Sequence, residues 1–322
     1  MVFGLAYNSA MPRPILYDTD PGIDDTLALL LALASPELEL LGLTTVFGNA
    51  SVTQTTANAL HVLTVAGRDE VPVVPGADAP LARPFAGPAT HVHGADGLGN
   101  IERSTPARAA TAWHGGAADF IADTALARPG EVTVVAVGPL TNLALAVQRE
   151  PRLAGAVWQV VVMGGAVFCA GNATPVAEAN IYKDPEAARV VLGAGWPVVL
   201  VGLDVTMQTC LGQAGLAAIT HSHTPVANLI AQIAPVYFDS YLTRYGMDSI
   251  PLHDPSAMAY ALDPTLFETR RLPLYVETEG RCAGQTVPDP RRQWSPLPEV
   301  EVCTSVDASR LVGLLIDRLA RL

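Results

Sequence analysis

The sequence has few aromatic residues and few cysteines, and each scarcity excludes a class of protein. Only 6% of the 322 residues are aromatic, so the core must be built from Ala, Val and Leu. The four cysteines form no CxxC pair, and their spacing fits neither a zinc nor an iron–sulfur site. A disulfide framework is not expected in a chain of this size. We therefore expect reduced thiols and a cytoplasmic protein.

Positive charge and long apolar runs are also scarce. Lys and Arg together number 19 against 31 Asp and Glu, which gives a net charge of −12. Because a nucleic-acid-binding surface needs a basic patch, this balance argues against a nucleic-acid partner. Half of the residues are hydrophobic, yet no uninterrupted apolar run approaches the length of a membrane span. We expect a soluble protein with a large core and no membrane partner.

The N-terminal residues 1–13 contain one basic residue and no apolar segment followed by a cleavage site. They do not have the pattern of a signal peptide, and we expect a flexible extension. Translation could start at Met11 in place of Met1. No repeat, low-complexity tract or linker divides the remainder, so we expect one domain over residues 1–322.

What the sequence does contain is an alternation of strand and helix patterns. Val- and Leu-rich strands without a polar face predict a mostly parallel sheet that is covered by helices on both faces. The predicted fold is an α/β protein with an open, doubly wound (Rossmann-like) sheet and a helical C-terminal elaboration. The predicted strands are 14–17, 40–46, 71–74, 132–137, 159–163, 198–202 and 271–277. The predicted helices are 26–34, 52–66, 110–127, 140–148, 184–192, 213–245, 254–262 and 307–321, with a long loop at 75–109.

The most unusual stretch is 17–25, which has four aspartates within eight residues, Asp18, Asp20, Asp24 and Asp25. Apolar runs on either side place these acids on a turn from a strand to a helix. Helix capping explains one or two acids at such a place but not all four. Carboxylates this close repel each other unless a cation lies among them, and hard oxygen ligands suit calcium or magnesium.

Unusual residues also follow the other predicted strands. They are Gly48-Asn49, Gly138-Pro139, Gly164-Gly165 and Asp204. In open parallel sheets, ligands bind outside the carboxyl ends of the strands. We therefore expect these strand ends to converge on one site.

The loop after the fifth predicted strand carries Asn172, Glu178 and Asn180. Amide and carboxylate groups suit a polyhydroxyl ligand, because each sugar hydroxyl both donates and accepts hydrogen bonds. The alternative is that these side chains only form turns.

Two histidine segments are further candidates. His253-Asp254 precedes a predicted helix that Asp254 could simply cap, or Asp254 could join the acidic cluster. His91 and His93 lie in a glycine-rich loop that suits a lid over a substrate. No further His or Cys lies nearby, which argues against zinc.

These segments together resemble the nucleoside hydrolases of the inosine–uridine preferring type. The matching blocks follow the order of that family between about residues 14 and 320: 18–25, 44–49, 137–142, 162–166, 177–181, 184–188 and 252–255. The resemblance implies calcium-dependent hydrolysis of the N-glycosidic bond of ribonucleosides to free base and ribose, in nucleoside salvage.

The resemblance also implies roles for individual residues. Calcium would be held by Asp20, Asp25, Asp254 and the backbone carbonyl of Val137. The ribose contacts would be Asp24, Asn49, Met163, Asn172, Glu178 and Asn180. Asp20 would also be the general base, with Asp18 as support.

The group that protonates the leaving base would be His253, with His93 as a second candidate. Tyr237 and Tyr241 are four residues apart on a predicted helix, so they share a face that could contact the base or pack in the core. His253 favours a pyrimidine-preferring or nonspecific enzyme acting on uridine, cytidine and inosine. Ala179 stands where many relatives have an aromatic residue, so packing around the substrate could be looser. The family forms dimers or tetramers, so we expect a homodimer or homotetramer.

Three alternatives stay open at this point. The substrate could be another N-riboside such as nicotinamide riboside. The protein could be a phosphohydrolase with Asp18 as nucleophile, because Asp-x-Asp after a strand can serve that chemistry. It could also bind nucleosides without turning them over.

Overall fold

The computed structural model describes residues 11–102, 109–294 and 296–322. A nine-stranded sheet runs through the described part in the order β10-β9-β11-β6-β5-β4-β1-β2-β3. Its strands are β1 (Arg13–Thr19), β2 (Leu38–Thr45), β3 (Val73–Pro75), β4 (Thr133–Ala136), β5 (Gln159–Met163), β6 (Val198–Val201), β9 (Phe267–Val276), β10 (Thr286–Pro288) and β11 (Glu299–Val306). Neighbouring strands from β11 to β3 pair in parallel, whereas β9 is antiparallel to both of its neighbours. The predicted mostly parallel sheet is confirmed.

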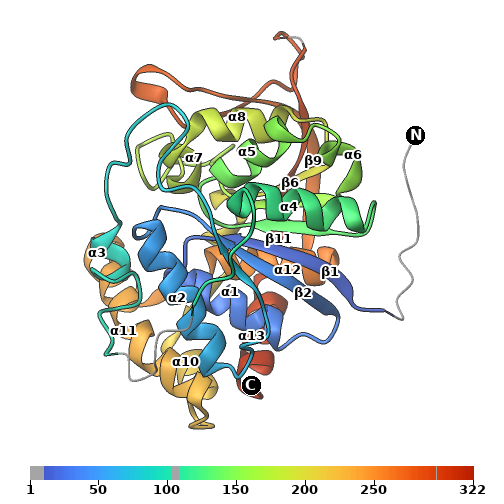
Figure 1. Ribbon diagram of the computed structural model, residues 1–322. Helices are drawn as coiled ribbons and strands as arrows, with labels where there is room; N and C mark the ends of the chain where they lie inside the picture. The colour runs from blue at the N-terminus through green and yellow to red at the C-terminus, as the bar shows by residue number, and fades with distance from the viewer. Residues whose placement is uncertain (1–10, 103–108, 295) are drawn as a thin grey trace.

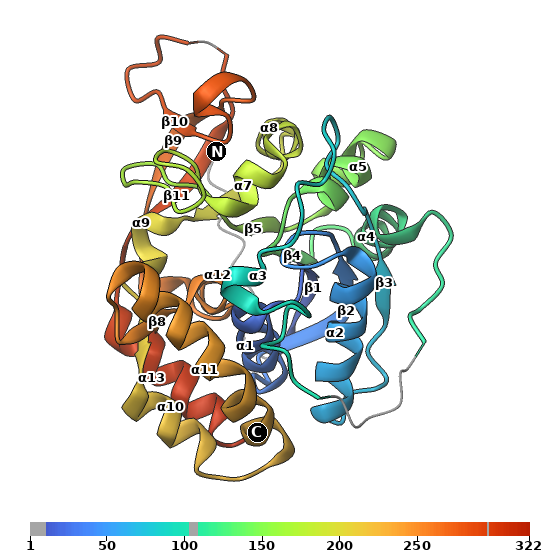
Figure 2. The ribbon, with the colours of Figure 1, turned by 90° about the vertical axis from the view of Figure 1, so that its left-hand side faces the viewer.

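Helices cover both faces of this sheet (Figure 1). One layer consists of α4 (Gly116–Ala127), α5 (Thr141–Arg149), α6 (Leu153–Ala156) and α8 (Pro185–Gly193). The opposite layer consists of α1 (Ile23–Leu33), α2 (Val52–Val65), α10 (Gln213–Thr220), α11 (Pro225–Tyr245), α12 (His253–Leu262) and α13 (Ala308–Leu319). Figure 2 shows α10, α11 and α13 gathered beside one another, and they form the predicted helical C-terminal elaboration.

Short elements complete the described chain. They are α3 (Thr90–His93), α7 (Ala179–Lys183), α9 (Leu203–Thr206), the small antiparallel pair β7 (Cys210–Gly212) and β8 (Ser249–Pro251), and the single 3₁₀ turns at Pro264–Leu266 and Gly280–Cys282. None of the helices in the described ranges has the length and apolar character that a membrane span requires.

Two separate hydrophobic cores lie on the two faces of the sheet. Successive side chains of a strand point to opposite faces, so Ile15 and Tyr17 enter the core beside α1 while Leu16 enters the core beside α5. All three are fully buried. Burial on both faces explains why this strand is a continuous apolar run.

Helix α1 is buried on all sides because it lies between the sheet and the helices α12, α11 and α13. All of its residues except Leu33 are buried. This position explains the apolar run without a polar face in the sequence. It also fixes the turn before the helix, where the acidic cluster lies.

The boundaries of the six predicted parallel strands move by at most two residues, whereas some helices differ more. The helix predicted from residue 110 begins at Gly116, after a left-handed Gly115 with φ 77°. The stretch 213–245 forms two helices, because Thr224 caps the second one and accepts a hydrogen bond from the amide of Ala227. The predicted long loop contains the short helix α3, and its residues 103–108 lie outside the described residues.

Strand β11 was not predicted, and the late strand β9 begins four residues earlier than expected. Polar residues interrupt both segments, so each lacks the continuous apolar run of a central strand. Of the predicted N-terminal extension 1–13, residues 1–10 lie outside the described residues, and Arg13 is the first residue of β1.

The burial of α1 predicts a large effect of truncating its core side chains. Leu30 is fully buried, so Leu30→Ala should lower the free energy of unfolding by about 3 kcal/mol, because it leaves a cavity. Leu242→Ala is the matched control, because Leu242 is 55% exposed and should cost at most about 0.5 kcal/mol. Urea unfolding followed by circular dichroism measures both. Equal losses would contradict the packing described here.

Candidate active site

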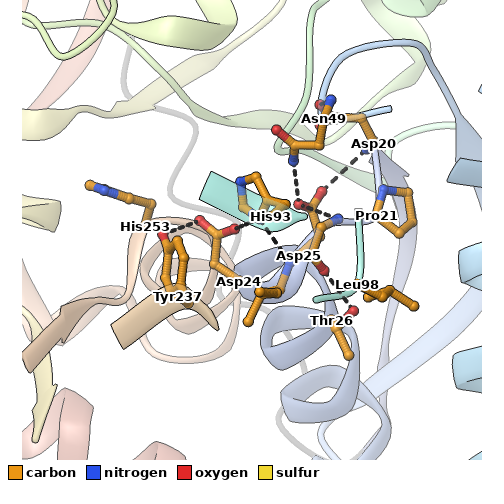
Figure 3. Close-up of polar contacts among 12 residues, drawn as sticks. Asp20, Pro21, Asp24, Asp25, Thr26, Asn49, His93, Leu98, Tyr237 and His253 are labelled. Carbon is orange, nitrogen blue, oxygen red and sulfur yellow. Dashed lines mark hydrogen bonds and ion pairs between the residues drawn. The ribbon is translucent and has the colours of Figure 1, made fainter. Parts of the chain in front are cut away.

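The acidic turn between β1 and α1 is held in place by the carboxylate of Asp25. Its Oδ1 accepts hydrogen bonds from Thr19 Oγ1 at 2.6 Å and from the amide of Asp20 at 3.2 Å. Its Oδ2 accepts from the amide of Gly22 at 2.9 Å and from Asn49 Nδ2 at 3.0 Å. Figure 3 shows Asp25 and Asn49 meeting at this turn. A carboxylate in the first turn of a helix is favourable, so the cluster begins with one stably placed acid.

Asp20 is completely buried and has two different environments at its two oxygens. Oδ2 accepts hydrogen bonds from the amide of Asn49 at 2.7 Å and from Lys183 Nζ at 3.3 Å. Oδ1 is buried and has no hydrogen-bond partner. Burial raises the pKa of Asp20 well above its usual value, and the ammonium of Lys183 acts in the opposite direction.

Two glycines at neighbouring strand ends make room for the Asp20 carboxylate. A Cβ at Gly138, after β4, would lie 2.6 Å from Asp20 Oδ1. A Cβ at Gly48, after β2, would lie 1.9 Å from Asp20 Oδ2. Neither distance is compatible with a side chain, so the glycines at these strand ends serve the acidic site directly.

Asp24, Asp25 and Asp254 form a compact group of buried acids. One carboxylate oxygen from each lies within 4.8 Å of the others. Burial and then the neighbouring carboxylates raise the pKa of Asp24 to about 7 and that of Asp254 well above its usual value. Asp24 Oδ1, like Asp20 Oδ1, is buried without a hydrogen-bond partner.

This donor set fits a divalent cation that prefers oxygen. Several carboxylates buried close together are costly unless a positive charge compensates them, and two of their oxygens are free of hydrogen bonds. The compact group contains Asp24, whereas the resemblance assigns Asp20 to the metal and Asp24 to the ribose. Asp20 adjoins this group through its backbone hydrogen bond to Asp25.

A cavity of about 400 Å³ opens above these acids. Ten of the twelve predicted site residues line it, so segments far apart in the sequence do meet: Asp24, Asn49, His93, Val137, Met163, Asn172, Glu178, Asn180, His253 and Asp254. The other two, Asp20 and Asp25, are buried beside the cavity and reach its wall through their hydrogen bonds to Asn49.

Glu178 combines a structural role with its place in the cavity wall. It caps α7: its Oε1 accepts a hydrogen bond from the amide of Asn180 at 2.8 Å. Its Oε2 accepts from the amides of Gly165 and Ile181, each at 3.1 Å. Three N–H donors therefore fix the orientation of this carboxylate, although burial raises its pKa.

Asn180 is held by backbone carbonyls at two strand ends. Its Nδ2 donates to the carbonyl oxygen of Val137 at 2.7 Å and to that of Met163 at 3.2 Å. The Val137 carbonyl thus has one hydrogen bond already and keeps a second lone pair. Asn172 is fixed in a similar way, because its Oδ1 accepts from the amide of Ala179 at 2.9 Å. Asn172 lies in the loop before α7 and Asn180 lies in α7 itself, and both line the cavity.

His253 is a neutral, fully bonded histidine. Its Nε2 lies 2.7 Å from the hydroxyl of Tyr241, and its Nδ1 lies 2.8 Å from Thr206 Oγ1. Burial lowers its pKa to about 4. A neutral imidazole has one donor and one acceptor nitrogen, so it can pass a proton between these two hydroxyl partners.

His93 comes from the loop side of the cavity and is also neutral. Its Nδ1 accepts a hydrogen bond from the amide of Ile23 at 3.1 Å, and burial lowers its pKa to about 3. Its 4.0 Å approach to Asp24 is therefore no ion pair. The ring stacks on Tyr237, with centroids 5.5 Å apart, and the Tyr237 hydroxyl donates to Asp24 Oδ2 at 3.1 Å (Figure 3).

Comparison with known proteins identifies the family of this chain. The family model described as "Inosine-uridine preferring nucleoside hydrolase" matches residues 15–313. The chain belongs to the inosine-uridine preferring nucleoside hydrolase family. It is 40% identical to a probable uridine nucleosidase 2 of Arabidopsis thaliana, over 95% of this chain and 97% of the relative.

Solved nucleoside hydrolases share the fold over their full length. A plant nucleoside hydrolase superposes with a TM-score of 0.92 at 37% identity and covers 97% of this chain and 100% of its own. A purine-preferring ribonucleoside hydrolase from Gardnerella vaginalis superposes with a TM-score of 0.91 at 33% identity, over 96% and 98% of the two chains. These neighbours confirm the fold class and the assignment as an enzyme of the nucleoside hydrolase type.

Two further aspartates singled out in the sequence, Asp204 and Asp18, also lie outside the cavity wall of this nucleoside hydrolase. Asp204 does not join the site as predicted, because its carboxylate accepts hydrogen bonds from the amides of Val167 and Phe168 at 2.9 and 2.6 Å. It therefore fixes the loop after β5. Asp18 is completely buried, and its Oδ1 accepts from Thr44 Oγ1 and Asn142 Nδ2. Neither of these partners lines the cavity, whereas Asp20 is bound by the wall residues Asn49 and Lys183, so the structure does not favour Asp18 as the nucleophile of a phosphohydrolase.

Several residues of the cavity wall escaped the sequence prediction, among them Tyr182, Lys183, Arg244 and Tyr245. Arg244 and Tyr245 continue the face of α11 that carries Tyr237 and Tyr241, and helical spacing could have indicated them. Composition could have indicated Lys183, because it is the single lysine of the chain.

The close fit of Asp20 between two glycines predicts that Gly138→Ala is severe. The added methyl group must displace the Asp20 carboxylate, so kcat/KM for nucleoside hydrolysis should fall by about 100-fold or more. Gly155→Ala is the matched control, because a Cβ there meets nothing within 4 Å. Steady-state kinetics on both variants, after circular dichroism has shown that they are folded, measures the effect. Unchanged kinetics in Gly138→Ala would refute this role of the glycine.

Proposed function

We propose that this nucleoside hydrolase uses calcium to hydrolyse the N-glycosidic bond of ribonucleosides, releasing free base and ribose in nucleoside salvage. The observation that carries the proposal is the group of buried carboxylates with unpartnered oxygens beside a cavity of about 400 Å³. A cavity of this size suits a small ligand such as a nucleoside. We also propose a cytoplasmic homodimer or homotetramer.

The proposed metal ligands are Asp20, Asp25, Asp254 and the carbonyl oxygen of Val137. All four offer oxygen, which suits calcium and disfavours zinc. Val137 already accepts a hydrogen bond from Asn180, and its second lone pair is available to a cation. When bound, a divalent cation supplies Lewis acidity that lowers the pKa of a nearby water molecule.

Asp20 is the proposed general base. The oxygen of a water molecule forms a bond to the anomeric carbon of the ribose while the bond from that carbon to the base nitrogen breaks. The water must lose a proton in this step, and an ionised carboxylate can accept it. Lys183 favours the ionised form of Asp20, because its ammonium lowers the pKa of that carboxyl.

The polar wall of the cavity is suited to the ribose. The proposed contacts are Asp24, Asn49, Met163, Asn172, Glu178 and Asn180, which all line the cavity. The glycosyl carbon develops positive charge in the transition state, as in other glycoside hydrolyses. Fixed carboxylates close to the ring stabilise this charge without having to reorganise.

Protonation of the leaving base is proposed for His253 together with Tyr241. The base nitrogen takes the hydroxyl proton of Tyr241 as the glycosidic bond breaks, and Tyr241 regains a proton from water once the products have left. His253 is neutral, and it hydrogen-bonds to the Tyr241 hydroxyl that lines the cavity. His93 is the second candidate, with its Nδ1 accepting from the amide of Ile23. We place His253 first because it is hydrogen-bonded to Tyr241, which also lines the cavity.

For the substrate we propose a pyrimidine-preferring or nonspecific enzyme that accepts uridine, cytidine and inosine. The likeness to a plant uridine nucleosidase supports uridine, whereas the likeness to a purine-preferring enzyme keeps inosine in the set. Nicotinamide riboside is the competing N-riboside.

A substrate panel with a base-deficient variant tests this activity. The enzyme should release reducing sugar faster from uridine than from nicotinamide riboside. Asp20→Asn should lower kcat by about 10³-fold, because the general base is lost. Asp239→Asn is the control, because Asp239 is exposed on α11 and does not line the cavity. Activity retained in Asp20→Asn would refute the mechanism. Faster hydrolysis of nicotinamide riboside than of uridine would contradict the proposed substrate and support the competing one.

Removal of the metal tests the cofactor. Dialysis against a calcium chelator should abolish uridine hydrolysis, because the buried acids then lose their compensating charge. Addition of calcium should restore the activity, while zinc should not, because the proposed ligands are all oxygens. Ribose release is measured before and after each addition. Full activity in the chelated enzyme would show that no exchangeable metal is needed.

A further inference from the structure

Lys183 is the only lysine in the 322 residues, and the other 18 of the 19 Lys and Arg residues are arginine. It is the last residue of α7, and its side chain lines the active-site cavity. That side chain is 18% exposed, so most of it is enclosed by the cavity wall. The one side-chain ammonium group that the sequence provides therefore lies in the wall of the active-site cavity.

The ammonium group of Lys183 contacts two polar side chains of the site. Its Nζ lies 3.3 Å from Asp20 Oδ2 and 3.3 Å from Asn49 Oδ1. An ammonium is a compact point charge with three donors, whereas a guanidinium is a wide planar group. Asp20 Oδ2 also accepts from the amide of Asn49, so this oxygen has two N–H donors.

The two oxygens of Asp20 have different surroundings. Oδ2 is engaged by Lys183, while Oδ1 is buried without a hydrogen-bond partner. Asp24, Asp25 and Asp254 add negative charge on the same side of the cavity. Among the described residues that line the cavity, Arg244 also has a fixed positive charge, and its guanidinium lies over the exposed ring of Tyr245.

We propose that Lys183 is a resident counter-ion that shares Asp20 with the divalent cation, stabilising the metal-free site and weakening metal binding. This inference rests on the proposed function in one respect, namely that Asp20 is a metal ligand. Without metal, the ammonium compensates a buried carboxylate that would otherwise be unpaired. With metal, two positive charges act on one carboxylate and repel each other.

If Lys183 shares Asp20 with calcium, removal of its charge should have opposite effects on the calcium affinity and on the thermal stability of the metal-free protein. Lys183→Met removes the charge and keeps a side chain of similar length, so calcium should bind about tenfold more tightly. The melting temperature of the metal-free variant should fall by about 5 °C, because Asp20 then has no resident cation. Saturating calcium should reverse that loss. A residue with a merely structural role would weaken both properties together.

Calorimetric calcium titration and thermal unfolding in chelator are measured on the wild type and on three variants. Lys183→Arg keeps the charge and should bind calcium within about threefold of the wild type. Arg244→Met makes the same charge change at another place in the cavity wall and should change the affinity by less than about twofold. This control separates the effect of Lys183 from a general change in charge.

The outcomes separate this proposal from the proposed function, because neither measurement depends on turnover. An unchanged or weaker calcium affinity in Lys183→Met overturns the proposal, and so does an equal gain in Arg244→Met. If neither the wild type nor any variant binds calcium, both the proposal for Lys183 and the proposed dependence of the activity on calcium are overturned. Tighter binding in Lys183→Met alone supports it, even in an enzyme that fails to hydrolyse uridine.

The single lysine also permits a direct readout. Reductive methylation with ¹³C-formaldehyde keeps the positive charge and labels only Lys183 and the terminal amine, and Lys183→Met assigns the two signals in the NMR spectrum. Addition of calcium should shift the Lys183 resonance, because a second cation reaches Asp20. A resonance that stays unchanged at saturating calcium would overturn the sharing of this carboxylate.

Discussion

The burial of several carboxylates at one turn is the constraint on which the rest of this site depends. Asp20, Asp24, Asp25 and Asp254 are almost fully enclosed, and enclosure raises the pKa of Asp20, Asp24 and Asp254. A buried charge without a partner is strongly destabilising, so positive charge and N–H donors must be supplied nearby. The surrounding chain supplies some of these partners, and two unpartnered oxygens leave room for a cation.

The parallel sheet makes this concentration of acids possible. The carboxyl ends of β1, β2, β4 and β5 lie next to one another, so loops from distant parts of the sequence meet at one edge. Glycines after β2 and β4 leave space for Asp20, and Glu178 ties the loop after β5 to the same place. The opposite wall comes from α11 and α12, where Tyr241 and His253 form a hydrogen-bonded pair.

Much of the fold was predictable because strands buried on both faces are continuous apolar runs. This signal located β1 and β5 well, whereas β11 alternates Glu with Val and lacks it. The break between α10 and α11 was missed because the apolar pattern continues across it. The break itself depends on the helix cap at Thr224. The place of Asp204 was predicted wrongly, because position after a strand does not reveal which backbone amides a carboxylate will bind.

Residue types and their order along the chain were enough to predict the acidic turn, the family segments and hence the membership of the nucleoside hydrolases. Those features are local, and residue type and spacing are enough to show them. The resemblance also predicted that Asp254 joins Asp25, whereas the presence of Asp24 in the same compact group and the pairing of Lys183 with Asp20 were visible only in the folded structure. These contacts join residues far apart in the chain, and their formation depends on how the strand ends and helices pack.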